Sequence, residues 1–164
     1  MVCLPVSDTK DPKPDLGYRH FNCDHIKRAA AVYDRPIFAA VDGPFQSLVN
    51  QMGLMRVLTD WIRNRSKIFD AYEAESEKVL ALISKVTEFR VSALVVTDDF
   101  SSDNGPFVSP SDIDTMCSPF YTRAVKRIKE SGAAVFLHSC GNLSQLIPTI
   151  KSWQIDGFAA VSGI

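Results

Sequence analysis

His138 and Cys140 are the two side chains of this sequence whose types and spacing most directly suggest chemistry. They follow the apolar run 133–137, which is typical of a short buried β-strand. Successive strand side chains point to opposite sides, so His138 and Cys140 should project from one side of the strand's end. An imidazole and a thiol that converge there can supply two zinc ligands, and catalytic zinc usually takes three protein ligands plus one open position. The alternative is a hydrogen-bonded strand-end histidine beside a buried free cysteine, because two ligands alone do not define a metal site.

Carboxylates follow two other apolar runs. Asp42 comes directly after residues 36–41, and Asp98 and Asp99 come directly after residues 92–97. Two neighbouring carboxylates can repel each other and raise one pKa, which makes Asp98 and Asp99 candidate catalytic acids or bases. Adjacent strand residues point in opposite directions, so at most one of them should face a pocket. The alternative is that one carboxylate caps a turn and the other is solvated.

The elements that must position these residues alternate along the chain. Prolines among charged residues predict a loop over residues 1–20, and a short helix near 24–33 completes a lead-in that ends at residue 35. From 36 to 164, near-continuous apolar strands alternate with amphipathic helices, which predicts one α/β domain with a parallel sheet. The predicted strands are 36–41, 92–97, 133–138 and 157–161, and the predicted helices include 67–87 and 143–153. The helical pattern after residue 44 should break near Gly53 or Thr59.

Helix signals are clearest after residue 108. Ser109 suits the N-cap, Pro110 the first helical position and Asp112 the third, and Gly132 should end the helix. The expected buried stripe consists of Ile113, Met116, Cys117, Phe120, Ala124 and Ile128. Cys117 is therefore assigned to packing. In helix 67–87 the expected buried face consists of Phe69, Tyr72, Val79, Ile83 and Val86.

Both a barrel and an open doubly wound sheet satisfy this alternation. In either fold the carboxyl ends of the strands lie at one face, and that face carries the active site. Asp42, Asp98, Asp99, His138 and Cys140 all follow predicted strands, so we expect them at this face.

Composition narrows the function classes. The 164 residues are 46% hydrophobic and 23% charged with a formal net charge of −1, which fits a globular protein and gives no bulk attraction to nucleic acid. The apolar runs are strand-sized, so no membrane span is expected, and the N-terminus lacks a signal-peptide pattern. Cys3, Cys23, Cys117 and Cys140 form no CxxC pair, which favours a reduced, cytoplasmic protein.

Several motifs, in this order, resemble the uroporphyrinogen decarboxylase superfamily. They are the strand-end elements 42–45 and 95–100, then Asn104-Gly105-Pro106 and Ser109-Pro110, then His138-Ser139-Cys140-Gly141-Asn142. The last motif is similar to that of the branch containing zinc-dependent corrinoid methyltransferases. The resemblance covers residues 36–164 and implies an eight-stranded (β/α) barrel. Such a barrel needs about 250 residues, so the chain is expected to be a partial barrel of about four βα units.

The resemblance also implies functional roles. His138 and Cys140 match the family's zinc ligands, and the third ligand, a cysteine from a late strand, would lie outside this chain. Asp42, Gly43 and Asn142 would belong to the substrate-binding loops, with Gly43-Pro44 as a turn that lets the backbone approach the pocket. The implied reaction moves a methyl group from a methyl-corrinoid, held by a partner protein, to a small-molecule thiol.

Two rival functions stay open at this point. Uroporphyrinogen decarboxylation, which acts on a tetrapyrrole, needs no metal and so gives no reason for the pairing of His138 with Cys140. A non-catalytic fragment or binding protein is the other rival, because a partial barrel leaves strand edges and helix faces unpaired. Open hydrophobic edges favour association, so homo-oligomers, with two half-barrels pairing, are an expectation.

Overall fold

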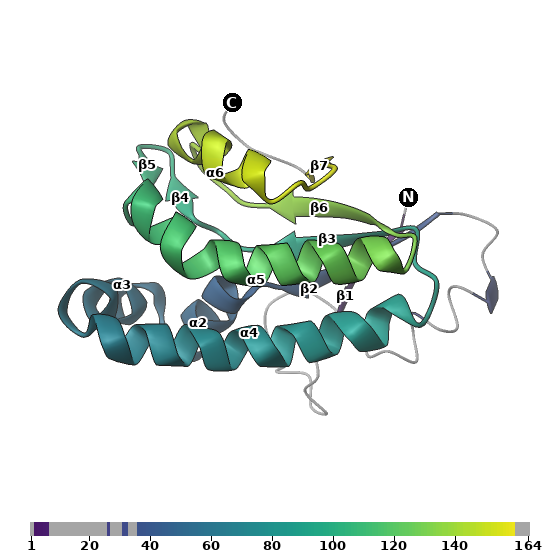
Figure 1. Ribbon diagram of the computed structural model, residues 1–164, viewed down its shortest axis with the longest axis horizontal. Coiled ribbons are helices and arrows are strands. Elements are labelled where there is room, and N and C mark those ends of the chain that lie inside the picture. The colour runs from purple at the N-terminus through teal and green to yellow at the C-terminus, as the bar shows by residue number, and fades with distance from the viewer. Residues whose placement is uncertain (1, 7–25, 27–30, 33–35, 160–164) are drawn as a thin grey trace.

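A computed structural model describes residues 2–6, 26, 31–32 and 36–159 as a parallel sheet with helices (Figure 1). The five strands follow the order β1-β2-β3-β6-β7, and each pairs in parallel with its neighbour. They are β1 (Val2–Val6), β2 (Ile37–Asp42), β3 (Ala93–Thr97), β6 (Ala134–His138) and β7 (Gly157–Phe158). The predicted parallel sheet of sequential neighbours is confirmed. An order without reversal is that of part of a (β/α)8 barrel, and the doubly wound alternative is wrong.

The predicted loop over residues 1–20 is wrong for residues 2–6, which form β1. Pro5, one of the residues behind that prediction, lies within this strand and pairs in register with Ala40. An edge strand tolerates proline because it has only one hydrogen-bonded neighbour. The predicted helix near 24–33 lies largely outside the described residues, and so does the end of the predicted strand 157–161.

Helices fill the intervals between the strands. They are α2 (Pro44–Met52), α3 (Leu54–Arg63), α4 (Arg65–Thr87), α5 (Pro110–Glu130) and α6 (Ile147–Ser152), with a 3₁₀ turn η1 at Ser144–Leu146. The expected break occurs at Gly53, whose φ of 82° favours glycine. A second break, at Asn64, was not predicted. The last helix was predicted as one element from 143 to 153, but it begins as η1.

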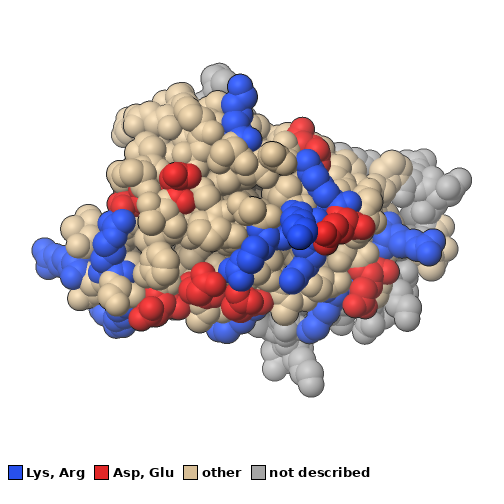
Figure 2. Space-filling model, in the orientation of Figure 1, with Lys and Arg blue, Asp and Glu red and all other residues tan. Residues whose placement is uncertain are grey.

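α4 and α5 run side by side along one face of the sheet (Figure 1). Arg123 of α5 links them by ion pairs with Glu73, at 3.0 Å, and with Glu77. Figure 2 shows acidic and basic side chains interspersed over this face, as the near-neutral net charge leads one to expect. Among the described helices, none combines the length and hydrophobicity needed to cross a bilayer.

The core lies between the sheet and these helices. All six residues of the predicted α5 stripe are buried, Cys117 among them, and the Ser109 hydroxyl accepts the Asp112 N–H at 3.1 Å as the N-cap. In α4 the prediction for Phe69 is wrong, because its side chain is 42% exposed and Ile68 is buried instead. The buried stripe continues from Ile68 to Tyr72 at four-residue spacing, which places Phe69 about 100° away around the helix.

The opposite face of the sheet positions the candidate site. Phe38 and Phe136 stack there with ring centroids 5.7 Å apart, and both are half-buried. His138 follows Phe136 by two residues and therefore projects from this same face. Beyond β3 the chain forms a short antiparallel hairpin, β4 (Ser101–Ser102) with β5 (Gly105–Pro106), which the sequence did not predict. This hairpin contacts the loop that follows His138.

Candidate metal centre

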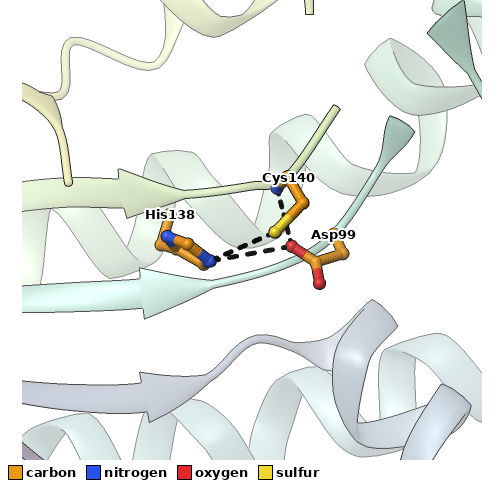
Figure 3. A group of neighbouring side chains, drawn as sticks. All are labelled: Asp99, His138 and Cys140. Carbon is orange, nitrogen blue, oxygen red and sulfur yellow. Dashed lines mark hydrogen bonds and ion pairs between the residues drawn. The ribbon is translucent and has the colours of Figure 1, made fainter. Parts of the chain in front are cut away.

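Three side chains converge where β3 and β6 end: Asp99, His138 and Cys140 (Figure 3). His138 Nε2 lies 3.6 Å from Cys140 Sγ and 3.9 Å from Asp99 Oδ1. The three ligand atoms all lie within 4.8 Å of one another. His138 and Cys140 thus lie on one side of the strand end, as the two-residue spacing predicts. Their role as metal ligands remains a prediction.

The backbone around His138 fixes which ring nitrogen is free. His138 Nδ1 lies 2.8 Å from the carbonyl oxygen of Ala159. A carbonyl oxygen only accepts hydrogen bonds, so Nδ1 carries a proton, and in the neutral imidazole the lone pair is then on Nε2. Nε2 is the nitrogen that faces Cys140 and Asp99. A histidine whose other nitrogen donates to a backbone carbonyl is arranged in the usual way for a metal ligand.

Cys140 is exposed, and its surroundings favour the protonated thiol when no cation is present. Desolvation raises the pKa of the Cys140 thiol, and the negative charge and hydrogen bond of Asp99 raise that pKa further. A divalent cation would reverse this effect, because a coordinating thiol is deprotonated by the metal. The acidic neighbour that disfavours a free thiolate would therefore favour a bound cation.

The loop after Cys140 is held close to the β4–β5 hairpin. Gly141 has φ of 80°, and a Cβ there would lie 2.5 Å from the Ser101 carbonyl oxygen, so a side chain would clash with backbone. The Asn142 N–H donates to the Ser102 carbonyl at 2.8 Å. The Asn142 side-chain oxygen accepts the N–H of Ser144, the first residue of η1, at 3.0 Å. The structure assigns Asn142 a local structural contact, and its role in substrate binding stays a prediction.

Asp98 turns away from the three converging side chains and into the core. It is fully buried, and its Oδ1 accepts the Gln46 N–H at 2.8 Å while its Oδ2 accepts the Tyr121 hydroxyl at 2.8 Å. Desolvation raises the pKa of Asp98 to about 7, against the opposing effect of these two hydrogen bonds. Of the predicted catalytic pair, the structure brings Asp99 to the site and places Asp98 beneath it, at the N-terminus of α2.

Gly43 and Asp42 lie at the neighbouring strand end. A Cβ at Gly43 would lie 2.1 Å from Asp98 Oδ2, so glycine at this position makes room for the buried carboxylate. The exposed Asp42 carboxylate accepts the Thr97 hydroxyl at 2.8 Å and the Asn50 amide at 2.9 Å. These contacts join β2, β3 and α2. The structure does not bring Asp42 and Gly43 into the group formed by Asp99, His138 and Cys140, and their substrate roles remain predictions.

Two features of the site were missed by reasoning from the sequence. Asp99 Oδ1 accepts the Cys140 N–H at 2.8 Å, and Tyr121 is the partner of the buried Asp98. Strand periodicity indicates that only one aspartate faces the site, but it does not identify the partners. Tyr121 lies beside the predicted α5 stripe, and its polar tip among apolar neighbours was the available signal.

A continuous parallel βα order, with polar side chains gathered where the strands end, defines a barrel-type α/β protein. The sequence pattern of the uroporphyrinogen decarboxylase (URO-D) family matches residues 5–161, and the chain therefore belongs to this family. The fold is similar to that of a methyltransferase from Methanosarcina mazei, with a TM-score of 0.70 and 16% sequence identity. The alignment covers 84% of this chain and 40% of that protein, so the chain spans less than half of that protein's length. No curated protein matches the sequence.

The three donor atoms fit a zinc ion in type, and the two separations measured from His138 Nε2 are close to those of a zinc site. Zinc in proteins takes imidazole nitrogen, thiolate sulfur and carboxylate oxygen, with bonds of roughly 2.0–2.3 Å. Tetrahedral bonds of those lengths separate the ligand atoms by roughly 3.4–3.6 Å. The observed Nε2–Sγ separation of 3.6 Å lies at this value, and the Nε2–Oδ1 separation of 3.9 Å is slightly larger.

Proposed function

We propose that this chain carries the metal-binding part of a zinc-dependent methyltransferase that moves a methyl group from a methyl-corrinoid to a thiol. The single observation that carries the proposal is the 3.6 Å approach of His138 Nε2 to Cys140 Sγ at the carboxyl ends of the strands. Membership in the uroporphyrinogen decarboxylase family and the methyltransferase-like fold support it. A metal-free decarboxylase gives no reason for this pairing.

Zinc held by His138 and Cys140 would lower the pKa of a thiol substrate, so that the nucleophilic thiolate is present at neutral pH. Such a thiolate would supply the electron pair for the bond to the methyl carbon, and the electron pair of the broken cobalt–carbon bond would stay with the corrinoid. The Ala159 carbonyl holds the His138 ring in the required orientation. The half-buried His138 and the exposed Cys140 leave the site accessible to a small thiol and to a corrinoid on a partner protein.

The experiment is a zinc titration of the purified chain, with metal content measured by mass spectrometry after dialysis. We expect one zinc per chain, and Cys140→Ser should weaken zinc affinity at least tenfold. Cys117→Ser is the matched control, because Cys117 is buried in the core and burial raises the pKa of its thiol well above the ordinary range. The control should bind zinc like the wild type and lose only packing stability.

Activity provides the second measurement. The zinc-loaded protein should demethylate methylcobalamin in the presence of a thiol. The reaction is monitored through the change in cobalamin absorbance. Unaltered zinc content in Cys140→Ser would contradict the methyltransferase proposal. The metal-free decarboxylase or a non-catalytic protein would then take its place.

A further inference from the structure

We propose that Asp99 is a third protein ligand of this metal site, so that one nitrogen, one sulfur and one carboxylate oxygen of this chain hold the ion. This inference rests on the metal site of the proposed function and adds a residue to it. It differs from the expectation based on resemblance, in which the third ligand is a cysteine outside the chain.

Strand register brings Asp99 to the site. In the parallel β3–β6 ladder, Thr97 is the partner of His138. Two residues further along each segment are Asp99, after β3, and Cys140, after β6. They therefore lie beside each other, and both point toward the side from which His138 projects. The intervening residues, Asp98 and Ser139, turn the other way and are fully buried. The same alternation that pairs His138 with Cys140 therefore adds Asp99 to the pair (Figure 3).

The separation between Asp99 and His138 suits a shared ion without rearrangement of the backbone, and all three donor atoms lie within 4.8 Å of one another. Asp99 Oδ1 lies 3.9 Å from His138 Nε2. Roughly 3.4 Å separates nitrogen and oxygen ligands in a tetrahedral zinc site. A small side-chain rotation that moves Oδ1 by a few tenths of an ångström closes that difference. The Asp99 side chain has room to rotate, because it is 40% exposed.

The carboxylate is already held in place. Its Oδ1 accepts the Cys140 N–H at 2.8 Å, which fixes the Asp99 side chain against the loop that carries the thiol. An ionised carboxylate offers about four lone-pair positions. Accepting one backbone hydrogen bond therefore leaves donor capacity for a cation. The polypeptide beneath is fixed as well, because the Asp98 N–H donates to the His138 carbonyl at 2.9 Å.

A carboxylate at this position changes the chemistry of the site. One thiolate and one carboxylate together neutralise a divalent cation before any substrate binds. Imidazole and carboxylate donors suit zinc and cobalt, whereas a second thiolate would make the site softer. The substrate thiolate would then be the second sulfur on the metal.

The test compares Asp99→Ala and Asp99→Asn with the wild type by competition of zinc against a coloured chelator. Asp99→Asn keeps an oxygen that accepts the Cys140 N–H but removes the charge and weakens the donor to the metal. A ligand role predicts that both variants lose zinc affinity at least tenfold, while the matched surface control Asp103→Asn stays within twofold of the wild type. Cobalt(II) substitution supplies a second readout, because loss of a ligand changes the ligand-field bands while the sulfur-to-cobalt charge-transfer band from Cys140 persists.

The outcomes separate this inference from the proposed function. If Asp99→Asn binds zinc as tightly as the wild type while Asp99→Ala does not, Asp99 only positions the Cys140 loop and its assignment as a ligand is overturned. If both variants bind like the wild type and Cys140→Ser does not, the inference also fails and the metal site stands. If the wild type itself binds no zinc, the proposed function fails as well. Thermal unfolding of each variant checks that loss of affinity is not loss of fold.

Discussion

The carboxyl edge of the sheet has two neighbouring regions with similar residues and different environments. At the ends of β2 and β3, Gly43 packs against the fully buried Asp98, and Asp42 accepts a hydrogen bond from Thr97 of β3. At the ends of β3 and β6, Asp99 and Cys140 are accessible and face His138. The adjacent residues Asp98 and Asp99 thus lie in different environments, one buried and one partly exposed. Strand alternation places one carboxylate in the core, where it joins elements, and the other at the open face, where it can meet a ligand.

The two regions are joined by β3, because Asp98 and Asp99 both follow directly after this strand. The buried region supports the accessible one through backbone hydrogen bonds. The Asp98 N–H donates to the His138 carbonyl, and the Phe100 N–H donates to the Ser139 hydroxyl. Changes in the buried region should therefore alter stability, and changes in the accessible region should alter metal binding.

The largest expected effect is the pH dependence of stability caused by Asp98. Its pKa is about 7 in the folded protein and near 3.8 ordinarily, so the unfolded chain loses this proton at lower pH than the folded chain does. Stability of the metal-free protein should fall as pH rises from 4 to 7, by up to about 4 kcal/mol, and stay low above that. Urea unfolding at pH 5 and pH 8.5 measures the fall, and Asp98→Asn should abolish most of it.

The carboxyl groups whose pKa is lowered affect stability in a more acidic pH range than Asp98 does. Lowered pKa values at Asp60, Asp112 and Asp156 add stability that is lost only below about pH 4. An equal fall between pH 5 and pH 8.5 in wild type and Asp98→Asn would show that the buried region does not contain a carboxylate of raised pKa.

The next largest effect is expected from Gly43→Ala. The added Cβ would lie 2.1 Å from Asp98 Oδ2, so either α2 or the carboxylate must shift. We expect a loss of about 3 kcal/mol in the free energy of unfolding, because overpacking in a closed environment is costly. The folded fraction should still bind zinc with wild-type affinity. A stable Gly43→Ala protein would mean that the contact with Asp98 is looser than the structure indicates.

A smaller effect is expected from Tyr121→Phe, which removes the hydroxyl that donates to Asp98 Oδ2. Hydrogen bonds to charged groups are worth more than those between neutral groups, so the loss should be about 2 kcal/mol at pH 8.5 and about 1 kcal/mol at pH 5. Urea unfolding at both pH values, with the zinc affinity of the same samples, gives the comparison. A pH-independent loss would indicate that Asp98 is not ionised in the core at high pH.

Much of this arrangement could be predicted from the sequence because it depends on local periodicity. Apolar runs predicted β2, β3 and β6, the cap at Ser109 predicted α5, and the two-residue spacing predicted that His138 and Cys140 share a side. The strand β1 was missed because Pro5 suggested a loop, and a proline in an edge strand carries no local signal of its pairing partner. Phe69 was placed on the buried face because hydrophobicity was weighed above helical spacing.

The rest depends on contacts between residues distant in sequence. Which of Asp98 and Asp99 faces the site is decided by the register of Thr97 with His138, and register is set by the whole sheet. The requirement for glycine at position 43 arises from a carboxylate more than 50 residues away in the chain. Motif resemblance indicated the family and the His138–Cys140 pair, but it pointed to a ligand outside the chain and gave no indication of Asp99 as a ligand.

The most direct test of the account is X-ray absorption spectroscopy of the purified chain loaded with one equivalent of zinc, without added thiol. Coordination by Cys140, His138 and Asp99 predicts one sulfur at about 2.3 Å and nitrogen or oxygen neighbours at about 2.0–2.1 Å, with imidazole scattering in the outer shells. Cys140→Ser should remove the sulfur neighbour and leave the lighter ones. A first shell with two sulfurs per zinc, or with none, would contradict the claim that this strand end holds the metal through one thiolate, one imidazole and one carboxylate.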